Sequence, residues 1–108
     1  MDKQTAIFGK IVLGPFIKQT QNQKVVCTFS LNEYSDLNVT INHEIVVFDD
    51  LAVFCHATLK RGEKIFVQGR NKLNSWKDKN NNLNEKTEVI ANYIGTIQFN
   101  KINTYNDR

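Results

Sequence analysis

The sequence predicts a single all-β domain, in which five strands close into a small barrel and one helix lies between the third and fourth strands. Two observations lead to this prediction. Apolar and polar residues alternate with period two over most of the chain, which is the pattern of strands with one buried face. The alternation is interrupted by one stretch with helical spacing, 49–59, followed by Gly62, and glycine is common just past the end of a helix.

Length and composition fit this class. A chain of 108 residues is long enough for one hydrophobic core and too short for two. Hydrophobic residues at 41% and charged residues at 23% are typical of a globular domain. A formal net charge of +3 is compatible with a polyanionic partner without requiring one. We expect the domain to cover residues 1–100 and a short frayed tail to cover 101–108.

The first strand is predicted over 5–13, with Gly9 as a bend or bulge. The Gly14-Pro15 pair breaks or turns the chain, and an extended piece follows over 16–19.

The second strand is predicted over 24–31 and the third over 39–48, with a polar loop between them. Cys27 belongs to the apolar alternation of the second strand, so we expect it to face the core as a small hydrophobic residue. The third strand ends in the apolar run 45–48.

The helix can be capped by Asp49 or Asp50, whose carboxylate can accept a hydrogen bond from a backbone N–H group. Helical spacing places on one face a set of residues that we expect to pack against the barrel: Leu51, Phe54, Cys55, Thr58 and Leu59.

The fourth strand starts at Lys64 and has the most informative alternation in the chain. Ile65 and Val67 share an apolar face. The opposite face carries aromatic rings, cations and amides: Phe66, Gln68, Arg70, Lys72, Asn74 and Trp76. Rings that stack on bases and cations that meet phosphates suit a single nucleic-acid strand, although a half-exposed antiparallel sheet also has a polar outer face.

A polar hairpin loop over 78–84 leads to a fifth strand over 86–99. Five strands with one helix between the third and fourth is the order of the OB-fold, a Greek-key barrel that often binds oligonucleotides. The pattern alone also allows another small barrel or an α+β sheet.

Several kinds of site are absent from the sequence. There is no nucleophile–base pair, carboxylate pair or phosphate-binding loop, so we expect no enzyme activity. The two cysteines form no C-x-x-C motif and the histidines lack zinc-ligand spacing, so we expect no metal, no cofactor and a reducing compartment. No apolar run has the length of a membrane span.

Short motifs in a fixed order resemble the single-stranded DNA-binding proteins of bacteria and mitochondria. No single motif is specific, but their order and spacing together indicate a shared fold and common descent. The motifs are Gly9-Lys10-Ile11, Pro15, Thr28-Phe29-Ser30-Leu31, Val46-Val47-Phe48, Leu51-Ala52, Leu59-Lys60-Arg61-Gly62, Val67-Gln68-Gly69-Arg70, Ser75-Trp76, Thr87-Glu88-Val89 and Ile97-Gln98-Phe99. The resemblance implies binding of single-stranded DNA without sequence preference by a homo-oligomer, usually a tetramer.

By position, the resemblance implies that Trp76 and Phe48 stack on bases and that His43 and Phe66 lie at an oligomer interface. It places Lys10, Lys18 and Lys72 near the nucleic-acid strand. Lys77 and Lys79 flank a loop that in the family leans over the nucleic acid, and Arg70 is a further cation on the same face, at a position where the family varies. The residues themselves allow other roles. Both rings can pack as core, the lysines can solubilise the surface, and His43 can be a structural histidine.

The third strand departs from the family pattern. The family usually has Trp-His followed by Arg, whereas this chain has Asn42, His43 and Glu44, so one stacking ring is lost and a carboxylate that repels phosphate is gained. The chain also ends in Thr-Tyr-Asn-Asp-Arg, without the acidic tail of bacterial members. We therefore expect a protein of the mitochondrial matrix, with the bacterial cytoplasm as the alternative.

Taken together, these observations predict a protein that protects single-stranded DNA during mitochondrial replication and maintenance, with other replication or complex subunits as further partners. Asn42 and Glu44 favour an alternative, an OB-fold subunit derived from this family that acts mainly in protein interactions within a larger assembly. A primosomal-type OB dimer is a third interpretation.

Overall fold

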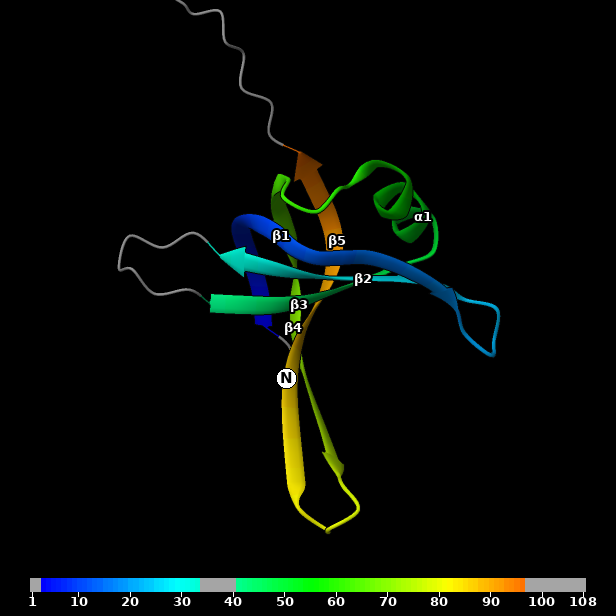
Figure 1. Ribbon diagram of the computed structural model, residues 1–108, viewed down its shortest axis with the longest axis vertical. Helices are drawn as coiled ribbons and strands as arrows, with labels where there is room; N and C mark the ends of the chain where they lie inside the picture. Colours follow the sequence, from blue (N-terminus) through cyan, green and yellow to red (C-terminus); the bar gives the residue numbers. More distant parts are fainter. Residues whose placement is uncertain (1–2, 34–40, 97–108) are drawn as a thin grey trace, which may run out of the picture.

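The computed structural model describes residues 3–33 and 41–96. Five strands form a closed barrel in the order β1-β2-β3-β5-β4, and one helix connects β3 to β4 (Figure 1). Neighbouring strands are antiparallel except β3 and β5, which are parallel. The elements are β1 Lys3–Gln19, β2 Val25–Glu33, β3 Ile41–Phe48, α1 Asp49–Thr58, β4 Lys64–Lys77 and β5 Leu83–Thr96. This is the strand and helix order of the OB-fold, so the predicted fold class is confirmed.

Strand β1 differs from its prediction because it continues through Gly14-Pro15 instead of breaking there. Two register shifts against β2, between Ile11 and Leu13 and between Leu13 and Phe16, take up the extra residues. The structure has no bulge at Gly9, one of the two predicted possibilities. Gly9 pairs regularly with both neighbouring strands, and a Cβ atom there would lie 2.3 Å from the Asn32 carbonyl oxygen, so the glycine permits a close approach of two backbones.

The core lies inside the barrel and follows the predicted alternation. Ile65 and Val67 of β4 are buried, as is Cys27 of β2. Every strand contributes side chains to this core: Ile7, Ile11, Cys27, Phe29, Leu31, Ile45, Val47, Ile65, Val67, Val89, Ala91 and Ile94.

Helix α1 packs against β1, β2 and β3. Ala52, Cys55 and the following Leu59 are buried, whereas Phe54 and Thr58 are exposed, so the predicted packing face is only partly correct. The predicted aspartate cap is wrong. Phe48 occupies the N-cap position without a side-chain cap, because the chain passes directly from β3 into the helix. Asp49 and Asp50 therefore lie in the first turn, where their negative charges interact favourably with the positive end of the helix dipole.

The β4–β5 hairpin is longer than the barrel body. Asn71 pairs with Lys3, the first described residue of β1. Beyond Asn71, the strand β4 pairs only with β5 among the described residues, and this two-stranded extension projects from the body (Figure 1). We call it the arm: Leu73–Lys77, Leu83–Thr87 and the loop between them. The loop covers 78–82, so it is shorter than predicted and β5 begins earlier.

The arm's loop is organised by Asp78. Its Oδ1 atom accepts hydrogen bonds from the backbone N–H groups of Asn80 and Asn82, at 2.9 and 3.0 Å, and its Oδ2 atom accepts one from Asn84 Nδ2 at 3.1 Å. The hydrogen bond from Asn84, followed by that from Asn82, lowers the pKa of the Asp78 carboxyl.

Some predicted segments lie outside the described residues: the start of the third strand at 39–40, the end of the fifth at 97–99, and the tail 101–108. No helix in the described part of the chain is long and apolar enough to cross a membrane.

Two free cysteines, Cys27 and Cys55, are buried side chains of the core. Burial raises the pKa of both thiols and, together with the charge of the nearby Cys27, raises the pKa of Cys55 to about 12. The folded protein therefore keeps its thiol protons to a higher pH than the unfolded chain does. This contribution to stability is complete below about pH 9, the ordinary thiol value, and is lost as the pH rises towards 12.

We expect the free energy of unfolding, measured by urea titration, to fall between pH 9 and 11 in part because of Cys55. Each raised thiol contributes a slope of at most about 1.4 kcal/mol per pH unit. Cys55→Ala removes one ionising thiol and leaves the lysines and tyrosines unchanged. Its free energy of unfolding should therefore fall less steeply with pH than that of the native protein. Equal slopes for the two proteins would contradict the assignment.

Candidate nucleic-acid interface

The side chains that point away from the core form one continuous surface across the barrel, which we call the outer face. Strand register arranges them in rows that cross from strand to strand. The rows are Lys18, Val26 and Phe48; Phe16, Thr28, Val46, Ile90 and Arg70; Leu13, Ser30, Glu44, Glu88 and Lys72; and Lys10, Asn32 and Asn42.

Phe48 and Lys18 are brought together by this register. Phe48 ends β3 and is 37% exposed, so its ring lies on the outer face although an apolar run precedes it. Lys18 lies two strands away in the same row, with Val26 between them, which corresponds to roughly 10 Å across the sheet. One ring and one cation thus lie in the same row, separated by Val26.

Trp76 lies on the arm and is 48% exposed. Alternation along β4 puts Arg70, Lys72 and Asn74 on the same face as Trp76. Lys77, which was predicted to act with them, falls on the opposite face of the arm, and Lys79 lies in the loop. A cation that the sequence reading missed, Lys86, pairs with Asn74 across the hairpin and belongs to the Trp76 face.

An acidic pair interrupts the outer face between the Phe48 and Trp76 regions. Glu44 pairs with Glu88 through the parallel register of β3 and β5. The Glu44 Oε1 atom accepts a hydrogen bond from Ser30 Oγ at 3.4 Å and lies 3.8 Å from Lys86 Nζ. Glu88 Oε1 accepts a hydrogen bond from Asn74 Nδ2 at 2.6 Å. Glu88 was not predicted beside Glu44, because the sequence pattern does not give the register between β3 and β5.

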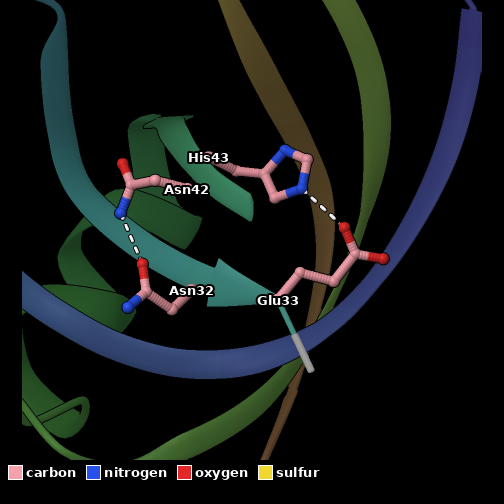
Figure 2. Close-up of polar contacts among 4 residues, drawn as sticks. All are labelled: Asn32, Glu33, Asn42 and His43. Atoms are coloured by element: carbon pink, nitrogen blue, oxygen red, sulfur yellow. Dashed lines mark hydrogen bonds and ion pairs between the residues drawn. The ribbon is translucent and has the colours of Figure 1, made fainter. Parts of the chain in front are cut away.

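Asn42 and His43 point to different sides of β3 (Figure 2). Asn42 donates a hydrogen bond from Nδ2 to Asn32 Oδ1 at 2.6 Å on the outer face, in the row of Lys10. His43 is partly buried, and its Nε2 atom lies 2.7 Å from Glu33 Oε1. His43 thus has a partner within its own chain, as the structural interpretation expects. Its predicted place at an oligomer interface stays a prediction.

Phe66 lies at the other end of β4 from Trp76, in a separate group of rings. It pairs with Phe8 of β1, and its ring centroid is 6.3 Å from that of Tyr93, with an interplanar angle of 67°. We call Phe8, Phe66 and Tyr93 the aromatic patch. Phe8 and Tyr93 are exposed, and the sequence reading singled out neither of them.

The described residues contain no group of three His, Cys, Asp or Glu side chains placed to hold a metal ion. What the outer face offers is rings and cations on a curved sheet, which suits stacking and phosphate contacts. The five-stranded closed barrel with its helix between β3 and β4 defines the protein as an OB-fold domain, a class that often binds oligonucleotides.

Residues 2–100 match the model of the Single-strand binding protein family, so the chain belongs to this family. Its members are non-enzymatic, and membership implies binding of single-stranded DNA. A crystal structure of a small single-stranded DNA-binding protein from Streptomyces coelicolor is similar, with a TM-score of 0.74 and 20% sequence identity. The similarity covers 90% of this chain and 95% of that one, and at this identity it supports the fold.

Proposed function

We propose that this protein binds single-stranded DNA on its outer face without sequence preference and protects single strands during mitochondrial DNA replication and maintenance. The observation that carries the proposal is the exposure of Trp76 and Phe48 on a face that also bears Lys72 and Lys18. Every base has a π-face, so stacking on these rings does not select among bases, and the lysines can neutralise phosphates.

Replacing Trp76 by Ala is expected to weaken binding of oligo-dT by about 1–3 kcal/mol, the usual contribution of one stacking platform. Trp76 is the only tryptophan, so its fluorescence reports on its own environment. In the native protein, single-stranded DNA should quench this fluorescence and a duplex of equal length should not. Titration of the fluorescence and of a labelled oligonucleotide's anisotropy measures both effects.

The matched control is Leu83→Ala, because Leu83 is exposed on the opposite face of the same arm. Its affinity should equal that of the native protein. Fluorescence that does not change when anisotropy indicates saturation would remove Trp76 from the binding site.

We further propose that the protein is a homo-oligomer larger than a dimer and that the aromatic patch is part of its interface. Three adjacent rings on an exposed sheet surface gain free energy when a second copy covers them. Phe66→Lys places a charge among these rings and should lower the molar mass measured by light scattering at micromolar concentration. Val53→Lys, at an exposed position on α1, should leave the mass unchanged. A monomeric mass for the native protein at high concentration would refute the proposal.

The acidic pair favours a second candidate function, a subunit that keeps the barrel but acts mainly in protein interactions. Two carboxylates near the middle of the outer face oppose the approach of phosphates. This candidate requires weak binding of oligo-dT by the native protein. A primosomal-type dimer would be distinguished by its molar mass.

For the compartment we propose the mitochondrial matrix, with the bacterial cytoplasm as the alternative. Two free cysteines fit either of these reducing compartments. Microscopy of the tagged full-length protein in its own cells tests the choice, and exclusion from mitochondria in a eukaryotic cell would overturn it.

A further inference from the structure

Phe16 is the most exposed phenylalanine among the described residues, at 56%. It lies on β1, in the segment 16–19, where the sequence predicted extended chain and a nucleic-acid contact at Lys18 but no role for Phe16. The two register shifts in β1 determine its direction, because they pair Leu13 with Ser30 and Phe16 with Thr28, both on the outer face. Its ring is therefore presented on the surface that carries Phe48.

The neighbours of Phe16 are suited to a nucleic-acid strand. Lys18 follows two residues later on the same face of β1, about 7 Å along the strand. Phe48 shares the row of Lys18, and Phe16 shares the next row with Thr28 and Val46. Two exposed rings thus lie near one lysine, Phe16 along β1 and Phe48 across the sheet, and no other charged side chain occupies these two rows on β1, β2 and β3.

We propose that Phe16 is a stacking platform for single-stranded DNA and that Phe16, Lys18 and Phe48 form a subsite on β1–β3. In this subsite, bases stack on the two rings and the phosphate between them lies at Lys18. The inference rests on the proposed function and deepens it. The subsite lies on the β1 side of the acidic pair, and the Trp76 face lies on the β4 side.

A separate subsite on β1–β3 also explains how the protein can do without a stacking ring at Asn42 of β3. At Asn42 the outer face has an amide hydrogen-bonded to Asn32, so no ring is available in that row. Phe16 supplies a ring on β1, on the other side of β2. A DNA strand that contacts Phe16, Lys18 and Phe48 does not cross Glu44 or Glu88. Binding is therefore split between two groups of rings instead of following one continuous path over β3 and β5.

The first test compares Phe16→Ala with Phe54→Ala by anisotropy titration of labelled oligo-dT. Phe54 is also an exposed phenylalanine, but it lies on α1, away from the outer face. Phe16→Ala should weaken binding by about 5- to 100-fold, the effect of losing one stacked base. Phe54→Ala should change it by less than about twofold, within the range of ordinary surface substitutions.

The second test moves the fluorescent reporter, the single tryptophan, from position 76 to position 16. In the variant Phe16→Trp with Trp76→Phe, the only tryptophan is at position 16. Oligo-dT should quench its fluorescence and duplex DNA should not. This measurement keeps a ring at both positions, so it decides the question even if Phe16→Ala folds poorly.

The outcomes separate the two proposals. If the native protein does not bind oligo-dT, the proposed function fails and this inference fails with it. If the native protein binds and Trp76→Ala weakens it, but Phe16→Ala behaves as Phe54→Ala and the tryptophan at 16 is not quenched, only this inference is overturned. A change in molar mass of Phe16→Ala without a change in affinity would assign Phe16 to self-association and would also overturn it.

Discussion

Replacing Asn42 by Trp and Glu44 by Arg is expected to raise the affinity for oligo-dT by tenfold or more. The new ring would lie on the outer face in the row of Lys10, and one stacking platform contributes about 1–3 kcal/mol. The arginine would replace a carboxylate that lies beside Glu88, so repulsion of phosphate becomes attraction and the arginine can pair with Glu88.

The double variant also loses two interactions of the folded protein, each of which contributes little to its stability. The hydrogen bond from Asn42 to Asn32 is exposed, and a typical hydrogen bond contributes only about 0.5–1.5 kcal/mol. The Glu44–Lys86 pair is partly exposed at 3.8 Å, and such pairs contribute about 0–1 kcal/mol. The contribution of the charge should be largest at low salt, because exposed charges are screened beyond roughly 10 Å at 0.1 M.

Anisotropy titration at two salt concentrations measures the effect, with Asn42→Trp alone and Glu85→Arg as controls. Glu85 is exposed on the opposite face of the arm from Trp76, so its replacement changes the net charge equally without touching the outer face. If the native protein binds and the double variant binds more tightly, the proposed function is supported. If the native protein barely binds and the variant binds well, the interaction subunit is supported. Tight native binding without any gain would mean that β3 does not contact DNA.

Replacing Gly69 by Ala is expected to destabilise the barrel by about 3 kcal/mol or more, because the added atom has no space. A Cβ atom at this position would lie 2.2 Å from the Ile90 carbonyl oxygen and 2.8 Å from the Ala91 Cα atom. Both are backbone atoms of β5, next to a register shift that leaves Asn92 as an extra residue. The two strands would have to separate within the barrel wall, where Gly69 also pairs with Thr5 of β1.

Thermal unfolding followed by circular dichroism measures this effect, which should lower Tm by more than about 10 °C for a domain of this size. Gly95→Ala is the matched control on the same hairpin, because its nearest atom would be a Tyr93 ring carbon at 3.4 Å. Alanine loses less entropy on folding than glycine, so Gly95→Ala should be neutral or stabilising by about 0.5–1 kcal/mol. An unchanged Tm for Gly69→Ala would contradict the close approach.

The local pattern of apolar and polar residues was sufficient to predict where the strands lie and which way many of their side chains point. The alternation on β4 correctly separated Ile65 and Val67 from Arg70, Lys72 and Trp76, because successive residues of a strand point to opposite faces whatever the partner strand is. The position of the helix was also predictable, since its spacing differs from that of the strands around it. Its buried face was less predictable, because contacts with β1–β3 put Phe54 outside although its spacing would allow it inside.

Pairing between distant strands was decided only by closure of the barrel. The parallel contact of β3 with β5 puts Glu88 beside Glu44, and the register of β4 with β1 and with β5 gathers Phe8, Phe66 and Tyr93. The shifts in β1 turn Leu13 outward and bring Phe16 into the row of Val46. The sequence specifies which face of the strand each residue takes. The residues beside it on that face, contributed by other strands, depend on the register between strands. That register is fixed only when the strands twist, shift and close around one core.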